Sequence, residues 1–337
     1  MRIVLISPLG FPVNSETKYA GIEKLVYEYA RSLSNSHEVT VLGHSQSIFP
    51  DKVTLLGTDS AGIQDIYIEA EIKQYQTYQS ILRNFDIIHD FSHQHFASRF
   101  NPNLSSLNLF WHAPNEIQYL KAPYNIIGLS RWACRQFKQY YHQEARYQQS
   151  IGLDIETYKI DSQKKRTDRF LCLGIMDTQK GNLEVAKLCN EANVPLDIAG
   201  QPFNKDYVQE VLKYVDGKQI RYLGEVSESD KVSLMQTCKA LVYYSDRPEV
   251  TSHKVQESML CGAPVITARI GALPEIITDG INGILCKSSD DYLQAFKNVD
   301  SLIPSKVYNS LIETYNIRNV TKNYEPLYLE VAKGLRW

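Results

Sequence analysis

Cysteine pairs are missing from this sequence of 337 residues. Its six cysteines form no C-x-x-C motif and mostly stand among apolar residues, as reduced core cysteines do: Cys134, Cys172, Cys189, Cys238, Cys261 and Cys286. No ligand-rich spacing such as H-E-x-x-H is present either. These absences favour a metal-free protein of the cytoplasm.

Long apolar runs are missing as well. The first residues, Met1–Ile6, form too short an apolar run for a signal peptide, and no stretch approaches the roughly 20 residues that a membrane span needs. Any membrane contact is therefore expected to be peripheral. The 36 basic residues nearly balance the 38 acidic ones, and this balance argues against a general nucleic-acid binder.

What is present is an alternation of strand and helix patterns in both halves of the chain. An apolar strand at 3–6, a helix that begins near Ala20 and Gly21, and a strand at 39–42 predict a βαβ unit. Further strands are predicted at 87–89, 107–110, 126–129, 170–174, 196–200, 220–224 and 241–244. Because the first unit lacks G-x-G-x-x-G, an NAD-dependent dehydrogenase loses most of its support.

The length predicts two domains, since single cores stop growing near roughly 250 to 300 residues. The polar run 161–168 has no periodicity and is the best candidate for the linker. Two doubly wound α/β domains that face each other across a cleft are the simplest product of this pattern. The segment 130–149 is predicted to be helical, and its basic and aromatic residues indicate an ordinary solvated face more often than a membrane surface.

The segment 248–266 concentrates residues with chemical potential. It suits a helix with Ser252 as its N-cap and Gly262 just past its end. Glu257 lies about 200° around this helix from Val255, so it is not part of the apolar stripe and is expected to face a cleft.

A helix N-terminus at a cleft attracts phosphate through its N–H groups and its dipole. The carboxylates of Glu249 and Glu257 suit the hydroxyl groups of sugars. A sugar nucleotide offers both kinds of group. The bare spacing is equally consistent with an amphipathic helix that carries two solvated glutamates.

The spacing Glu-x7-Glu followed by Gly-x-Pro-Val-Ile resembles the signature of the retaining GT-B glycosyltransferases of family 4. The resemblance covers nearly the whole chain through further motifs: Gly152–Asp154, Leu173–Gly181, Gly224–Val226, Ala268–Glu275 and Asp279–Gly283. It implies a GT-B fold with an acceptor-side Rossmann-like domain over 1–160, a nucleotide-sugar-binding Rossmann-like domain over 168–318, and a helix over 319–337 that crosses back to the first domain. The sequence alone is equally consistent with a last helix that packs on the second domain.

The resemblance also implies roles for single residues. His112 and Glu249 would act on the transferred sugar, and Glu257 would hold the ribose. The donor-binding set is Gly21, Lys180, Gly224, Val226, Thr251, Ser252 and Glu257, with no metal and no cofactor beyond the sugar nucleotide. Judged locally, a histidine at a strand end is more often structural, and Gly21 equally well eases a turn. His89, Asp90 and His93 stay unassigned, with a metal cluster as the alternative.

Two departures from the family pattern stand at the expected diphosphate site. Ile175 replaces the family's arginine, which leaves Lys180 as the one obvious cation, and Val250–Ser252 replaces Gly-Phe-Gly. Whether these changes reduce activity stays open.

The expected function is metal-independent transfer of a hexose from a nucleotide-diphosphate sugar to an acceptor hydroxyl, with retention. The acceptor stays open among a glycan, a lipid-linked sugar and a small molecule. The alternatives are another GT-B enzyme, such as a sugar-nucleotide epimerase, and a non-catalytic sugar-nucleotide-binding module.

Overall fold

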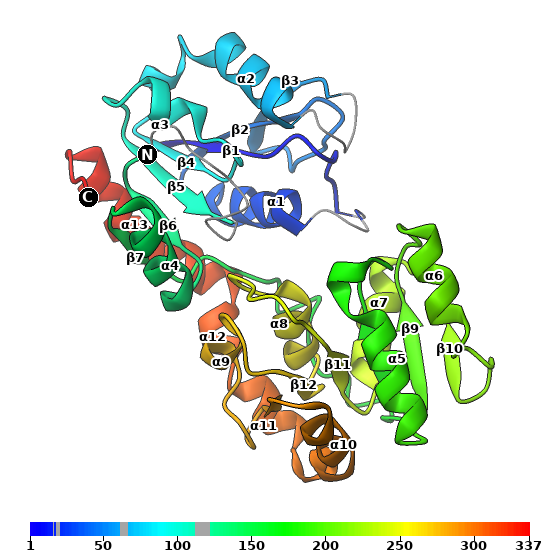
Figure 1. Ribbon diagram of the computed structural model, residues 1–337. Helices are drawn as coiled ribbons and strands as arrows, with labels where there is room; N and C mark the ends of the chain where they lie inside the picture. Colours follow the sequence, from blue (N-terminus) through cyan, green and yellow to red (C-terminus); the bar gives the residue numbers. More distant parts are fainter. Residues whose placement is uncertain (16, 18–20, 61–66, 112–121) are drawn as a thin grey trace. The chain divides into compact units, whose positions relative to one another are not determined.

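The computed structural model describes residues 1–15, 17, 21–60, 67–111 and 122–337 (Figure 1). The chain divides into two compact units. The first comprises residues 1–154 and 314–337, and the second comprises residues 155–313. Each unit is built on its own parallel sheet, so the predicted pair of doubly wound α/β domains is confirmed. Among the described residues, no helix has both the length and the apolar character needed to cross a membrane.

The first unit contains a seven-stranded sheet in the order β3-β2-β1-β4-β5-β6-β7. Its strands are β1 (Arg2–Ile6), β2 (Glu38–His44), β3 (Val53–Thr58), β4 (Ile87–Asp90), β5 (Ser106–Phe110), β6 (Ile126–Gly128) and β7 (Ala145–Tyr147). Its helices are α1 (Gly21–Leu33), α2 (Tyr67–Tyr78), η1 (Leu82–Asn84), α3 (Phe96–Phe100), α4 (Arg131–Tyr141) and α13 (Ile317–Ala332). The central strands β4 and β5 are buried along their whole length, as expected of a parallel sheet covered on both faces.

The C-terminal helix α13 packs against α1 and β4 of the first unit. Two of its tyrosines, Tyr324 and Tyr328, join His89 in a buried aromatic cluster, where His89 Nδ1 lies 2.7 Å from the Tyr328 hydroxyl. Burial lowers the pKa of His89 to about 3, so this ring is neutral. His89, one of the two histidines that the sequence left unassigned, is therefore part of the core that joins α13 to the sheet.

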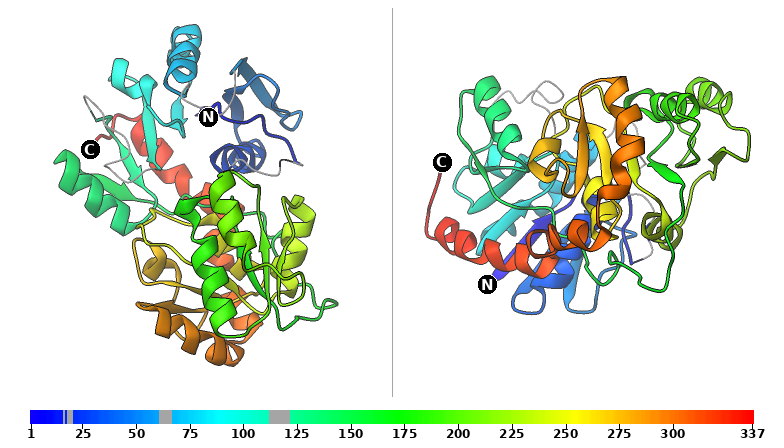
Figure 2. Two further views of the ribbon diagram at one scale, coloured as in Figure 1. Left: turned by 45° about the vertical axis from the view of Figure 1, so that its right-hand side comes forward. Right: turned by 90° about the horizontal axis from the view of Figure 1, so that it is seen from below.

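The second unit contains a six-stranded parallel sheet in the order β10-β9-β8-β11-β12-β13. Its strands are β8 (Phe170–Leu173), β9 (Leu196–Ala199), β10 (Ile220–Tyr222), β11 (Leu241–Tyr243), β12 (Val265–Ala268) and β13 (Gly283–Cys286). The helices that flank it (Figure 2) are η2 (Thr178–Lys180), α5 (Asn182–Glu191), α6 (Lys205–Leu212), α7 (Glu228–Thr237), α8 (His253–Leu260), α9 (Leu273–Ile276), α10 (Ser289–Asn298), η3 (Val299–Ser301) and α11 (Pro304–Asn309). The short helix α12 (Ile312–Tyr315) stands at the return to the first unit.

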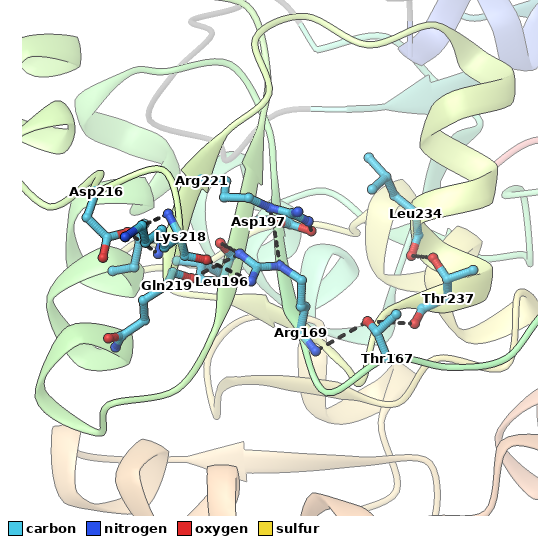
Figure 3. Close-up of polar contacts among 11 residues, drawn as sticks. Thr167, Arg169, Leu196, Asp197, Asp216, Lys218, Gln219, Arg221, Leu234 and Thr237 are labelled. Carbon is cyan, nitrogen blue, oxygen red and sulfur yellow. Dashed lines mark hydrogen bonds and ion pairs between the residues drawn. The ribbon is translucent and has the colours of Figure 1, made fainter.

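The amino ends of strands β8 to β10 are joined by one buried carboxylate, Asp197 (Figure 3). Arg169 Nε and Arg221 Nε donate hydrogen bonds of 2.8 and 2.7 Å to Asp197 Oδ1. Arg169 also donates to the carbonyls of Leu196 and Gln219, at 2.7 and 2.9 Å. Arg169 therefore ties the start of β8 to backbone carbonyls at the starts of β9 and β10, and both guanidinium groups hold these strand ends through Asp197.

The run 161–168, predicted to be the linker, instead lies inside the second unit. Arg166 donates hydrogen bonds of 2.7 Å to the carbonyls of both Cys238 and Cys261, which anchors the run to the ends of α7 and α8. The boundary falls between Asp154 and Ile155 rather than near 160, and the second boundary falls at 313 rather than 318. Most of the run is exposed, as its polar composition suggests, but the hydrogen bonds of Arg166 attach it to the second unit, so it is not a free linker.

Secondary structure differs from the sequence prediction in the segment 130–149. The helix α4 ends at Tyr141, because His142 adopts a left-handed conformation with φ of 53°. The following residues 145–147 form the edge strand β7 beside β6. The strands β3, β7, β12 and β13 were not predicted.

Candidate functional site

The strand order of the second unit reverses between β8 and β11, which lie side by side in the sheet. Chains that leave two such strands turn to opposite faces, and ligands of open α/β sheets bind in the crevice at this point. The loop after β8 runs from Gly174 to Lys180, and the loop after β11 runs from Tyr244 to Ser252. The predicted residues Lys180 and Glu249 therefore meet at the carboxyl edge of the sheet, although 68 residues separate them in the chain.

Glu249 is held from several directions. Its carboxylate accepts a hydrogen bond from the Tyr243 hydroxyl, and its Oε1 lies 3.7 Å from Lys180 Nζ. Its backbone oxygen accepts a 3.0 Å hydrogen bond from Ala272 N. Gly271, with φ of +59°, packs so closely that a Cβ there would lie 2.7 Å from the Glu249 backbone. The side chain of Glu249 keeps one quarter of its area exposed, so it is fixed and still accessible to a ligand.

A second lysine, Lys254, lies beside this pair and was not identified from the sequence. Its ammonium lies 3.5 Å from the centroid of the Tyr243 ring and donates a 3.2 Å hydrogen bond to the Leu173 carbonyl. Burial lowers the pKa of Lys254 to about 8; Glu249 opposes this shift and Lys180 adds to it. The sequence did contain a signal for it: Lys254 is the second residue of the helix that was expected to bind phosphate at its N-terminus.

The helix α8 begins at His253, with Ser252 at its N-cap position as predicted. The Ser252 side chain makes no capping hydrogen bond, however, and Thr251 Oγ1 instead accepts a 3.2 Å hydrogen bond from Gln256 Nε2. The Ser252 side chain therefore accepts from none of the first N–H groups of α8, while the Ser252 carbonyl accepts a 3.2 Å hydrogen bond from Val255 N. Such groups are suited to an anion.

Glu257 does not face an open cleft, which corrects the sequence prediction. It lies away from the Val255 face of α8, as predicted, but it is only 7% exposed. Its two oxygens accept hydrogen bonds from the Tyr158 hydroxyl, at 2.9 Å, and from Lys231 Nζ, at 3.0 Å. Although burial favours a neutral amine, Glu257 and Glu228 raise the pKa of Lys231, so this ammonium is charged. Helical periodicity predicted which face of α8 carries Glu257, but it could not predict that Tyr158 and Lys231 cover this side chain.

Gly224 and Val226 lie in the loop between β10 and α7. Gly224 has φ of +72°, and its carbonyl accepts a 2.8 Å hydrogen bond from Gly200 N in the loop that follows β9. No atom lies within 4 Å of a Cβ built at Gly224, so its backbone is open to a flat ligand. Both residues thus stand at the same edge of the sheet as Lys180 and Glu249.

The remaining predicted residues belong to the first unit or lie outside the described residues. Gly21 is the exposed first residue of α1. His112 follows β5 by two residues and lies outside the described residues, as does Ala20. His93 donates from its backbone N–H to the buried Glu71, at 2.8 Å. Within the described part of the chain, no three His, Cys, Asp or Glu residues are grouped as a metal site requires.

Comparison with known families gives the second unit its assignment. Residues 154–315 match the family model described as glycosyl transferases group 1. This unit is a group 1 glycosyltransferase domain. The resemblance inferred from the motifs is thereby confirmed at the level of group 1, and the narrower family 4 stays a prediction.

Relatives with curated descriptions match part of the chain. An uncharacterised glycosyltransferase of Methanocaldococcus jannaschii is 30% identical over 118 residues, which cover 35% of this chain and 30% of that protein. The N-acetyl-alpha-D-glucosaminyl L-malate synthase of Bacillus anthracis is 23% identical over 157 residues, or 44% of this chain and 40% of the enzyme. The matches thus span less than half the length of these relatives.

Solved structures match over the whole chain. AviGT4, a glycosyltransferase of avilamycin A biosynthesis, has a TM-score of 0.75 at 19% identity and covers 100% of this chain and 99% of its own. HepE of Anabaena, solved with UDP and glucose, has a TM-score of 0.72 at 15% identity and covers 98% and 100% of the two chains. At these identities the likeness establishes the fold, which is that of the GT-B glycosyltransferases.

Proposed function

We propose that this group 1 glycosyltransferase domain works in a retaining enzyme that moves a hexose from a nucleoside-diphosphate sugar to an acceptor hydroxyl, without a metal. The observation that carries the proposal is the meeting of Lys180, Glu249 and the N-terminus of α8 at the switch point of the second sheet. A cation and a helix N-terminus suit a diphosphate, and a carboxylate suits the hydroxyl groups of a sugar. The UDP and UDP-glucose complexes of HepE support a donor of this class.

The charge that develops on the leaving diphosphate defines what the site must do. As the bond between the anomeric carbon and the phosphate oxygen breaks, Lys180 and the N–H groups of α8 stabilise the negative charge on that oxygen. Glu249 stabilises the positive charge that spreads over the sugar ring, and His112 is proposed to contact the same sugar. Glu257 is proposed to accept from the ribose hydroxyls, the role that the resemblance implies for it.

Retention follows if the acceptor attacks from the face that the diphosphate leaves. The acceptor oxygen then bonds to the anomeric carbon, and its proton passes to the departing phosphate oxygen. No enzyme nucleophile is needed on this route. A double displacement through a carboxylate is the alternative route, and it would leave a glycosyl–enzyme bond that mass spectrometry detects.

A non-catalytic sugar-nucleotide-binding module is the second candidate function. It is favoured by Ile175 in place of the family's arginine and by Val250–Ser252 in place of a glycine-rich turn. A sugar-nucleotide epimerase would use the same donor site without an acceptor.

The decisive experiment begins with thermal stabilisation of the full chain by UDP-, GDP-, ADP- and dTDP-sugars, since ligands that bind the native state raise its apparent stability. Hydrolysis of the stabilising donor is then followed with and without EDTA. We expect slow hydrolysis that EDTA does not abolish, and a glycosylated product when a free acceptor is added. Binding without any turnover would identify a binding module, and an epimerised donor would identify the epimerase. An EDTA-dependent reaction would overturn metal independence.

A further inference from the structure

Lys254 lies beside the proposed donor site, but its positive charge has no role in the function proposed above. Its ammonium can donate three hydrogen bonds, yet the structure gives it one carbonyl acceptor, the Leu173 oxygen, and one aromatic face, Tyr243. Among the described residues, no carboxylate oxygen lies within 4.0 Å of Lys254 Nζ. A half-buried cation without an ionic partner is costly to hold, because desolvation favours the neutral amine.

The charges around Lys254 do not balance. Two ammonium groups, Lys180 and Lys254, are coupled to a single carboxylate, that of Glu249. The Tyr243 hydroxyl adds no charge, because burial and the adjacent Glu249 raise its pKa far above neutral pH. These three side chains together therefore carry one excess positive charge, and the start of α8 adds a partial positive charge beside them.

Space is left open on one side of the Lys254 ammonium. A Cβ built at Gly174 would lie 3.6 Å from Lys254 Nζ and 3.9 Å from Lys180 Cβ. Any side chain at position 174 would therefore stand against both lysines. The glycine keeps the two cations approachable from the loop that follows β8.

We propose that Lys254 is the second cation of the diphosphate site and binds the leaving diphosphate together with Lys180. This inference rests on the proposed function and names a residue of its donor site. Two ammonium groups and a helix start suit a group with two or more negative charges, whereas a single carboxylate would need only one of them. Lys254 stands in the first turn of α8, the part of the helix that is proposed to face the diphosphate. The lysine thus supplies the charge that Ile175 does not.

The test compares the full-length protein with its Lys254→Met variant, which keeps the length of the side chain and removes its charge. Isothermal titration with UDP, GDP, ADP and dTDP finds the nucleotide that binds, and the same base is then titrated as the free nucleoside. We expect the variant to bind the diphosphate on the order of 10²-fold more weakly and the nucleoside with unchanged affinity.

The matched control is Lys239→Met. Lys239 also lies near an aromatic ring, that of Phe170, but it forms an ion pair with Asp300. It stands just before β11, at the amino ends of the strands and so away from the candidate site. This control should leave the affinity for the diphosphate unchanged. Thermal unfolding separates the two roles. Removal of a cation that stabilises the fold lowers the Tm of the free protein, whereas removal of a cation that serves only to bind a ligand does not. We therefore expect Lys254→Met to keep or raise the Tm of the free protein.

Several outcomes overturn the inference. If the wild-type protein binds a nucleoside diphosphate and Lys254→Met binds it equally well, Lys254 is not part of the site, while the proposed function stands. If Lys254→Met loses affinity for nucleoside and diphosphate alike and also loses Tm, its role is structural. If the wild-type protein binds neither a nucleoside diphosphate nor inorganic pyrophosphate, the inference and the proposed function both fail.

Discussion

The Tyr243 hydroxyl donates a hydrogen bond to the Glu249 carboxylate, which joins the last residue of β11 to the loop that follows it. The same tyrosine presents its ring face to the Lys254 ammonium, 3.5 Å from the ring centroid. One buried side chain therefore positions both the carboxylate proposed to act on the sugar and a cation proposed to act on the diphosphate. This relationship makes the two functions of Tyr243 separable by substitution.

Tyr243→Phe should lower kcat while leaving the affinity for the bare nucleoside diphosphate within about twofold. The variant keeps the ring under Lys254 but frees Glu249, which lies near Lys180 and can turn towards it. A hydrogen bond to a charged group is worth about 1.5 to 3 kcal/mol, so a loss of roughly ten- to 150-fold in kcat is expected. Tyr292→Phe is the control, since it loses a 3.1 Å hydrogen bond to the Tyr243 carbonyl. Equal kcat in the two variants would contradict the positioning role.

Glu249→Gln and Glu257→Gln should affect different steps. A contact to the sugar that develops charge chiefly slows the chemical step, and a contact to the ribose exists before and during that step. We expect Glu249→Gln to lower kcat on the order of 10²-fold, from roughly 3 kcal/mol of lost transition-state stabilisation, with little change in diphosphate affinity. Glu257→Gln should weaken both the sugar nucleotide and the bare diphosphate.

Because Glu257 also pairs with Lys231, its variant needs a check of folding. Circular dichroism and urea unfolding separate lost binding from lost structure. If both glutamine variants fold and keep wild-type affinity and rate, the Glu249–Glu257 segment is an ordinary helix and loop, and the proposed function falls with it.

Affinity for the nucleoside diphosphate should fall as the pH rises above about 8. The pKa of Lys254 in the free protein is lowered to about 8, so the ammonium is present below that pH and is lost above it. The groups that act on it are Glu249, Lys180 and Cys172, and titration of that thiol begins only near its raised pKa of about 11. Titrations from pH 7 to 9.5 should show the affinity falling by up to tenfold per pH unit above 8. Lys254→Met should give a nearly flat profile, and a parallel fall in both proteins would refute this assignment.

The stability of the free protein should respond to Lys254 with the opposite sign. Between pH 8 and 10.5 the unfolded chain holds a proton on this lysine that the folded chain has released, so this group stabilises the fold progressively as the pH rises. Buried cysteines and tyrosines act in the other direction at high pH. The quantity to measure is therefore the difference in free energy of unfolding between wild type and Lys254→Met, which should shift in favour of the wild type above pH 8.

Asp197→Asn should destabilise the second unit without affecting the donor site. The change removes the charge that two arginines share at the amino ends of β8 to β10. Arg221 is partly exposed, so we expect a loss near the lower end for a buried pair, about 3 kcal/mol. Urea unfolding measures this loss, and titration below the transition should give wild-type affinity for the diphosphate. A folded variant with weakened affinity would show that the two edges of the sheet are coupled.

The sequence determined the fold class and proposed two site residues, Lys180 and Glu249, that the structure brings close together. Continuous apolar runs such as Ile87–Ile88 and Leu171–Cys172 are buried on both faces of a parallel sheet, so strands and their alternation with helices could be predicted locally. Motif spacing likewise identified Lys180 and Glu249. The edge strand β7 escaped prediction, because Ala145–Tyr147 contains no continuous apolar run and stays partly exposed.

The tertiary structure alone decided which groups surround those residues. Lys254 became part of the site because β8 and β11 are neighbours in the sheet, which brings the Leu173 carbonyl and Lys180 to a helix more than 70 residues later. Helical periodicity gave the direction of Glu257 but not its burial against Tyr158. The sequence was equally consistent with two positions of the last helix, and packing of Tyr328 on His89 fixed it to the first unit. In each case the deciding contact joins residues that are far apart in the sequence. Local sequence patterns do not show which distant segments the fold brings together.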